Sequence, residues 1–145
     1  MFEGLDHLAI VVRDTREALQ VWRDRFGFRV VFSAVIDNGA LRVTHLDMGN
    51  TQLQLVQPLA KDHPLKQWLD ANGPGLHHFC MKVDSLSSVA DEMHGNGLES
   101  GEPRPHEGTQ GRQALFLDRA STGGVQVEIT GRAVVPVATG TKRVE

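Results

Sequence analysis

Two stretches in opposite halves of this chain share one pattern, and this internal repeat is the feature that most limits its fold. Gly4 to Val12 reads GLDHLAIVV and Gly75 to Val83 reads GLHHFCMKV, so that the opening Gly-Leu, a histidine at the fourth position and the final valine coincide. Both stretches are short and apolar, which is typical of β-strands. Internal repeats indicate units that bury their apolar faces against each other. The sequence therefore predicts two similar units packed together.

Each repeat continues with the same order of elements. The first predicts a helix over 14–26, opened by Asp14 and Glu17 at capping-box spacing, and strands over 28–36, 40–48 and 51–57. The second predicts a helix over 84–96, a short strand near Leu98, and strands over 112–117 and 125–130. The expected fold class is α+β, with two βαβββ repeats that form one curved mixed sheet around a metal-binding cleft and helices outside.

The length of 145 residues suits a single domain with a sizeable core. We divide residues 1–145 into repeat one at about 4–57, a linker and short helix at 58–74, repeat two at about 75–130, and a tail at 131–145 without clear periodicity. Open sheet edges in such a fold favour a homodimer.

Strand alternation separates an apolar face from a polar one. The apolar parity of the two opening strands comprises Leu8, Ile10, Val12, Phe79, Met81 and Val83. His7 and His78 fall on the other parity, because successive strand side chains point to opposite faces. The closing strands alternate in the same way and place Gln54 and Glu128 on the polar face. We expect these four side chains to project into the cleft, whereas His77 should point away from it.

A buried carboxylate and amide without partners would cost several kcal/mol, so these polar groups need compensation. A divalent metal provides it, because imidazole nitrogen and oxygen donors suit Co, Mn, Ni, Zn or Fe. The alternative is a hydrogen-bonded polar network in a ligand-binding cleft. The opposite parity should pack under the helices, with Trp22 and Phe26 buried against Leu8, Ile10 and Leu55.

Composition excludes several classes of function. A formal net charge of −3 gives no electrostatic footprint for nucleic acid or an anionic membrane. No apolar run approaches transmembrane length, and the N-terminus lacks a signal-peptide pattern. The single cysteine, Cys80, cannot form an internal disulfide, which fits a cytoplasmic protein.

The paired βαβββ layout with these four positions resembles the vicinal oxygen chelate superfamily, and within it most closely the methylmalonyl-CoA epimerases. The segments that carry the resemblance are LDHLAI at 5–10, LQLVQPL at 53–59, KQWL at 66–69, GPGLHHF at 73–79 and GVQVEI at 124–129. The resemblance covers roughly residues 4–130 and implies that the whole chain is one vicinal oxygen chelate domain.

The resemblance implies one divalent metal ion held by His7, Gln54, His78 and Glu128. It implies a metal-dependent epimerase, or isomerase, of a 2-acyl-CoA thioester such as methylmalonyl-CoA. The metal would stabilise the enolate formed when the α-proton leaves. A coenzyme A tail would need basic groups at the rim of the cleft, and Lys61, Lys66 and Arg104 lie in suitable loops.

Other members of the superfamily define the alternatives. A glyoxalase-type lyase would apply the same metal to a glutathione hemithioacetal, and an extradiol dioxygenase would use Fe(II) with one of the histidines and Glu128. A non-catalytic, resistance-type protein would bind a small molecule and typically lacks the four donors, all of which this chain has.

One position departs from the family pattern. Members with a dedicated glutamate base carry it three residues after the glycine of the second hairpin, and Gly39 puts that position at Arg42. A guanidinium stays protonated and cannot abstract a proton, but it can hold a carboxylate or phosphate. We therefore expect Arg42 to bind substrate, and the catalytic proton transfer to fall to Glu128, loosened from the metal, or to a metal-bound water.

Overall fold

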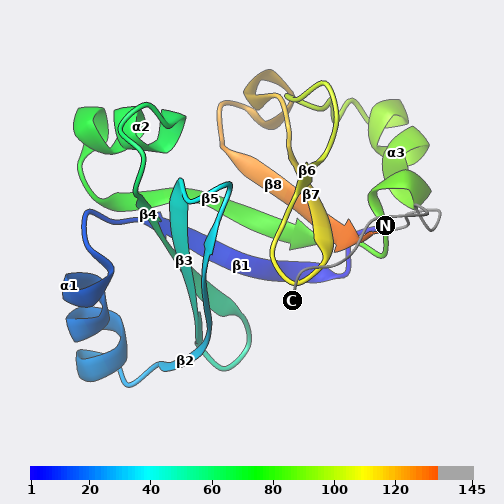
Figure 1. Cartoon of the computed structure of the whole chain (residues 1–145). Coiled ribbons are helices and arrows are strands. Elements are labelled where there is room, and N and C mark those ends of the chain that lie inside the picture. Colours follow the sequence, from blue (N-terminus) through cyan, green and yellow to red (C-terminus); the bar gives the residue numbers. More distant parts are fainter. Residues whose placement is uncertain (134–145) are drawn as a thin grey trace, which may run out of the picture.

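The computed structural model describes residues 1–133 and is built on one sheet of eight strands in the order β2-β3-β4-β1-β5-β8-β7-β6. Figure 1 shows that this sheet curls into a half-barrel. The strands are β1 (Gly4–Val11), β2 (Arg29–Ile36), β3 (Leu41–Asp47), β4 (Gln52–Pro58), β5 (Gly75–Lys82), β6 (His106–Glu107), β7 (Arg112–Phe116) and β8 (Val127–Arg132). The predicted fold of two similar halves around one curved mixed sheet is confirmed.

The two halves have matching topology and meet at the centre of the sheet. Within each half, one pair of strands is parallel, β1 with β4 and β5 with β8. The halves join where β1 pairs with β5 in antiparallel fashion. Both parallel pairs therefore lie beside the junction, and both can present side chains to the same central region of the sheet.

The helices begin where the sequence provides caps. They are α1 (Thr15–Leu19), which continues as the π-helix η1 (Gln20–Arg25), α2 (Pro64–Asn72), α3 (Leu86–Gly95) and the 3₁₀-helix η2 (Arg119–Thr122). The Asp14 side chain accepts a hydrogen bond from the Glu17 N–H, and Ser85 caps α3 in the same way through Ser88. Among residues 1–133, no helix is both long and apolar enough to cross a membrane.

Two apolar clusters pack the helices on the outer face of the sheet. In the first half, Leu8, Ile10 and Leu55 contact a cluster that includes Trp22. In the second half, Phe79 and Met81 lie in a cluster with residues of α3. The apolar parity therefore faces the helices, as predicted, and the opposite parity is left for the concave face.

The prediction that Phe26 is buried is wrong, since Phe26 is 58% exposed. The chain from Gln20 to Arg25 forms a π-helix, and the Phe26 N–H bonds to the carbonyl of Val21, five residues earlier. This wider turn changes the angular position of Phe26 relative to an α-helix. Its ring stacks on Trp22 at a centroid distance of 4.8 Å, so it covers the tryptophan without reaching the sheet.

The strand expected near Leu98 is also not found in the described part of the chain. Ser100 forms only an isolated bridge with Leu117, and the outer strand of the second half is β6, farther along. The last strand begins at Val127 and extends to Arg132, because a hydrogen-bonded turn from Thr122 to Val125 delays it. The predicted tail therefore contributes its first residues to β8, and its part at 134–145 lies outside the described residues.

Candidate metal centre

Three of the four predicted ligands meet on the concave face at the junction of the two halves. His7 comes from β1, His78 from β5 and Glu128 from β8, and one possible ligand atom of each lies within 4.8 Å of the others. Their side chains are only 7%, 5% and 11% exposed. Strand alternation therefore brought together residues that are far apart in the sequence.

The inner nitrogens of the two histidines have no hydrogen-bond partner among the described residues. Nε2 of His7 and Nε2 of His78 each lie 3.4 Å from the same oxygen of Glu128, Oε1, without hydrogen-bond geometry. Buried polar atoms without partners are rare, and each needs an explanation. Two imidazole nitrogens and a carboxylate oxygen that converge on one point fit a divalent transition metal, which would replace any hydrogen on those nitrogens.

Two β-bulges place a second polar group behind each histidine. The register between β1 and β5 shifts at Asp6 and again at His77, so each strand carries one extra residue immediately before its ligand histidine. Oδ2 of Asp6 lies 2.8 Å from Nδ1 of His7, and Nδ1 of His77 lies 2.8 Å from Nδ1 of His78. The Asp6 carboxylate favours hydrogen on Nδ1 of His7, and the contact with His77 allows hydrogen on Nδ1 of His78, so that each Nε2 is the nitrogen that faces the cluster.

The expectation that His77 points away from the site is therefore wrong. Simple alternation assigns it to the outer face, but the bulge turns it towards His78. Burial and the neighbouring His78 lower the pKa of His77 to about 4, which keeps its imidazole neutral. A neutral His77 can accept the hydrogen of His78 Nδ1.

His7 and Glu128 shift each other's pKa, so that each favours the charged form of the other. Burial opposes protonation of His7, but hydrogen bonding to Asp6 and the charge of Glu128 outweigh it and raise the pKa of His7 to about 9. Burial likewise opposes ionisation of Glu128, yet its contacts with His106, His7 and His78 hold the pKa of its carboxyl well below the usual range. The carboxylate form of Glu128 is therefore strongly favoured.

Asp6, His7 and Cys80 form a second, overlapping group with possible ligand atoms. Burial raises the pKa of the Cys80 thiol, which disfavours the thiolate that binds metals. Asp6 is already engaged with Nδ1 of His7, whereas the unpartnered atom of His7 is Nε2. The group with His78 and Glu128 is therefore the better metal site.

Gln54, the fourth predicted ligand, lies in β4 at the position equivalent to Glu128. Gln54 pairs with Ala9 across the parallel strands, just as Glu128 pairs with Cys80 in the other half. Its amide nitrogen lies 3.0 Å from Nε2 of His45. That contact uses the nitrogen end of the amide and leaves the oxygen end for another partner.

His45 is a polar residue of the concave face that the sequence reasoning missed. Its ring lies 6.2 Å from that of His7, and its Nδ1 is 3.1 Å from Oε1 of Gln52. Burial and the neighbouring His7 lower the pKa of His45 to about 4. The pairing of His45 with Gln54 in the β3–β4 hairpin was the signal that could have found it.

Arg42 is not brought to this cluster. Arg42 and His45 point to opposite faces of β3. The partner of Arg42 across the hairpin is Gln57, which accepts hydrogen bonds from Thr15 at the start of α1. Arg42 thus belongs to the helix side of the sheet, and the expected role in substrate binding gains no support.

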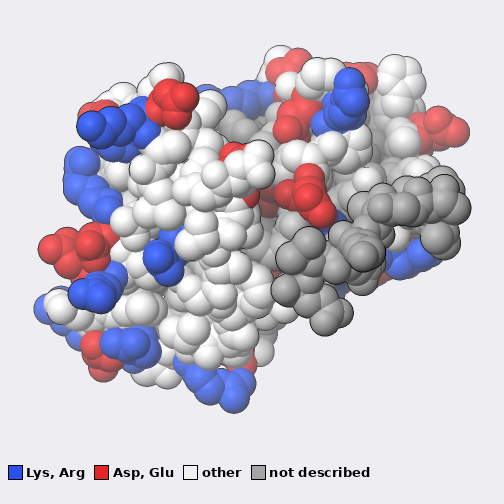
Figure 2. Space-filling view, in the orientation of Figure 1, with Lys and Arg blue, Asp and Glu red and all other residues white. Residues whose placement is uncertain are grey.

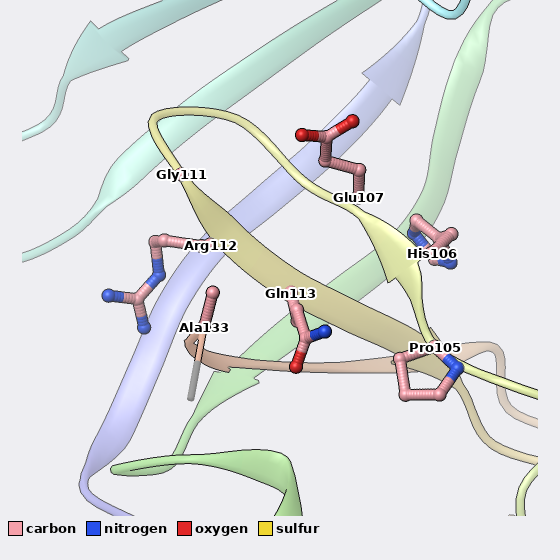
Figure 3. Close-up of a pocket in the computed structure, with 7 residues that line it drawn as sticks. All are labelled: Pro105, His106, Glu107, Gly111, Arg112, Gln113 and Ala133. Atoms are coloured by element: carbon pink, nitrogen blue, oxygen red, sulfur yellow. The ribbon is translucent and has the colours of Figure 1, made fainter. Parts of the chain in front are cut away.

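The second half contributes two further polar residues that the sequence reasoning missed. His106 in β6 lies with Nε2 3.2 Å from Oε2 of Glu128. Arg112 in β7 lies with Nε 3.4 Å from Oγ1 of Thr130, on the same face of β8 as Glu128. Figure 3 shows a pocket beside this hairpin with His106 and Arg112 on opposite flanks, and both line it.

Comparison with known proteins identifies related chains. The sequence model of the glyoxalase/bleomycin resistance protein/dioxygenase superfamily matches residues 6–116. The mitochondrial methylmalonyl-CoA epimerase of Mus musculus is 30% identical over 126 residues, which span 86% of this chain and 71% of the mouse protein.

Solved structures agree with these relatives. Methylmalonyl-CoA epimerase from Mycobacterium tuberculosis has a TM-score of 0.83 and 26% identity, with 91% of this chain and 89% of that chain covered. A variant of the Streptomyces coelicolor methylmalonyl-CoA epimerase, in complex with 2-nitronate-propionyl-CoA, has a TM-score of 0.81 and 25% identity, with 92% and 100% covered.

Proposed function

The chain belongs to the glyoxalase/bleomycin resistance protein/dioxygenase superfamily, and on this basis we propose that it is a metal-dependent epimerase of a 2-acyl-CoA thioester such as methylmalonyl-CoA. The similarity to epimerases over most of the chain supports an isomerase. The observation that carries the metal site is the pair of unpartnered Nε2 atoms that face one oxygen of Glu128.

His7, His78 and Glu128 would hold one divalent ion, with the amide oxygen of Gln54 as a fourth donor. Co, Mn, Ni, Zn or Fe suits this mixture of nitrogen and oxygen donors. When bound, such an ion acts as a Lewis acid that stabilises negative charge developing on the substrate as the α-proton leaves. Asp6 and His77 would help to keep the two imidazoles in the orientation and tautomer that such binding requires, as their contacts with Nδ1 of His7 and of His78 support.

Glu128 is the proposed proton carrier. Its contacts keep the side chain as a carboxylate with a low pKa, so Glu128 would have to loosen from the metal and from His106 to become a base strong enough to accept the α-proton. A carrier must lie within hydrogen-bond reach of the reacting carbon, and a carboxylate at the centre of the concave face satisfies this for a substrate bound there. Inversion also requires a proton donor, such as a water molecule, on the opposite face of the carbon, because Glu128 alone could return the proton only to the face from which it took it.

Cations at the rim would bind the acidic parts of an acyl-CoA. Lys61 lies just before α2, and Lys66 lies within it. Figure 2 shows Lys and Arg side chains gathered, among some acidic ones, over the half that carries α1 and α2. Lys66 already pairs with Asp70, so Lys61 is the freer of the two for a phosphate. Arg112 brings a guanidinium to the face of β8 that carries Glu128 and would suit the substrate carboxylate better than Arg42.

The test combines metal analysis of extensively dialysed protein with exchange of the α-proton of methylmalonyl-CoA in D₂O. We expect one equivalent of a divalent metal and metal-dependent deuterium incorporation. Bound metal without exchange would instead support another metalloenzyme of the superfamily, such as a lyase acting on a glutathione hemithioacetal. Absence of both would support a non-catalytic binding protein.

A further inference from the structure

Glu128 is contacted from two sides by different groups. Its Oε1 faces Nε2 of His7 and Nε2 of His78, at 3.4 Å from each. Its other oxygen, Oε2, lies 3.2 Å from Nε2 of His106. The two oxygens of this carboxylate therefore have distinct surroundings, and only Oε1 points at the cluster of candidate metal ligands.

His106 is itself held in place by Glu102. Nδ1 of His106 lies 2.9 Å from Oε1 and 3.0 Å from Oε2 of Glu102. Oε2 of Glu102 also accepts the backbone N–H of Phe116 at 2.6 Å, which fixes the carboxylate to β7. The Phe116 ring stacks on His106 at a centroid distance of 5.6 Å and an interplanar angle of 23°. The imidazole is thus anchored along one edge and across one face.

The strand order explains why these residues meet. Phe116 pairs with Glu128 across β7 and β8, and His106 pairs with Ala114 across β6 and β7. His106 and Glu107 leave β6 on different sides (Figure 3), and the histidine is the one that contacts Glu128. A carboxylate at each ring nitrogen leaves His106 as a donor on both sides.

We propose that His106, anchored by Glu102, is a positioning residue that binds Oε2 of Glu128 and leaves Oε1 alone to face the metal. This inference rests on the proposed metal site. Without the hydrogen bond, the Glu128 side chain could rotate and offer either or both oxygens. Removal of a residue that hydrogen-bonds a metal ligand, without itself touching the metal, typically lowers metal affinity about 10- to 100-fold.

The experiment titrates the metal-free full-length protein with Co²⁺ by calorimetry, in the wild type and in three variants. His106→Leu keeps an apolar contact with Phe116 but removes the donor, and we expect its Kd to rise about 10- to 100-fold. His106→Gln places an amide N–H near the position of Nε2, and we expect it to recover most of the affinity. Unchanged affinity in His106→Leu would overturn the proposal, as would equal losses in both variants.

His94→Leu is the matched control. His94 pairs with Glu99 at 2.8 Å, but the pair is exposed at the end of α3. We expect this variant to bind Co²⁺ like the wild type. A loss equal to that of His106→Leu would attribute both effects to general destabilisation and overturn the positioning role.

A second readout does not depend on the metal. Crystal structures of the metal-free wild type and His106→Leu should differ in the side-chain rotamer of Glu128, with its carboxylate turned from the wild-type position in the variant. An unmoved Glu128 would overturn the positioning role whatever the titration shows. If the wild type binds no metal but Glu128 turns in the variant, the positioning role holds and the proposed metal site fails.

Discussion

The two candidate ligand histidines differ in the group behind each of them. A carboxylate supports His7, whereas a neutral imidazole supports His78. We expect His78→Ala to abolish most metal binding, because it removes a ligand. His77→Ala should weaken binding by a smaller factor, about tenfold, because it removes only the group that orients His78. Metal content after dialysis and calorimetric Kd values measure both effects.

The order of these two effects is the critical result. A His77→Ala variant with wild-type affinity would show that the contact between the two imidazoles does not orient His78. It would restore the simpler expectation from strand alternation, in which His77 takes no part in the site.

Arg42 provides a test in the opposite direction. Because it lies opposite Gln57 on the helix side of the sheet, we expect Arg42→Ala to change both KM and kcat by less than about twofold. Steady-state kinetics of the epimerisation measure this. A large rise in KM alone would mean that the side chain reaches the substrate, as the position counted from Gly39 had suggested.

Strand alternation was sufficient to predict His7, His78 and Glu128, because one face of each strand is clearly apolar. It could not predict His77, since a bulge adds one residue and breaks the period of two. It also could not predict His106, whose contact with Glu128 depends on how the segment around β6 folds back beside β7. Residues placed by regular periodicity are predictable from the sequence, whereas those placed by an irregularity or a long loop are not.

Among the elements, the packing of α3 against β8 has little tolerance. A Cβ added at Gly131 would lie 2.8 Å from Cα of Ser85 and 3.2 Å from the carbonyl oxygen of Asp84. Both contacts are with backbone, which cannot move aside cheaply. We expect Gly131→Ala to lower the free energy of unfolding by about 1–3 kcal/mol, measured by urea denaturation.

Gly95→Ala is the control for this prediction. An added Cβ at Gly95, the last residue of α3, meets nothing within 4 Å. Its free energy of unfolding should stay the same or rise by about 0.5 kcal/mol, because alanine favours the helix. Equal losses in the two variants would show that crowding is not the cause.

The sequence also predicted the elements better than their details. The cap at Asp14 correctly marked the start of α1, and the helix predicted over 84–96 corresponds to α3, which Ser85 caps. The spacing of apolar residues such as Trp22 and Phe26, however, does not distinguish an α-helix from the π-helix that follows α1. The position of Phe26 depends on that difference. The outer strand β6 is only two residues long, too short for any periodicity to indicate it.

For the whole molecule, the sheet ends in open edges at β2 and β6. Val31 and Val35 of β2 are 41% and 48% exposed, so this edge is apolar as well as unpaired within residues 1–133. We expect a homodimer, as edges of this kind favour association. Light scattering should give about twice the chain mass of 15.9 kDa, and a mass equal to one chain would contradict the prediction.

The equivalent positions of Gln54 and Glu128 have a consequence for the site as a whole. Each half of the chain offers one imidazole and one oxygen donor, but only the second half offers a charged one. Counted over these four groups alone, without the Asp6 carboxylate behind His7, a divalent ion would keep one uncompensated positive charge. If both halves carried glutamine at this position, the ion would keep both of its positive charges, and if both carried glutamate, it would keep none. The divergence of a single pair of residues between the halves would therefore set how strongly the centre attracts an anion, and Gln54→Glu would cancel that attraction without moving a strand.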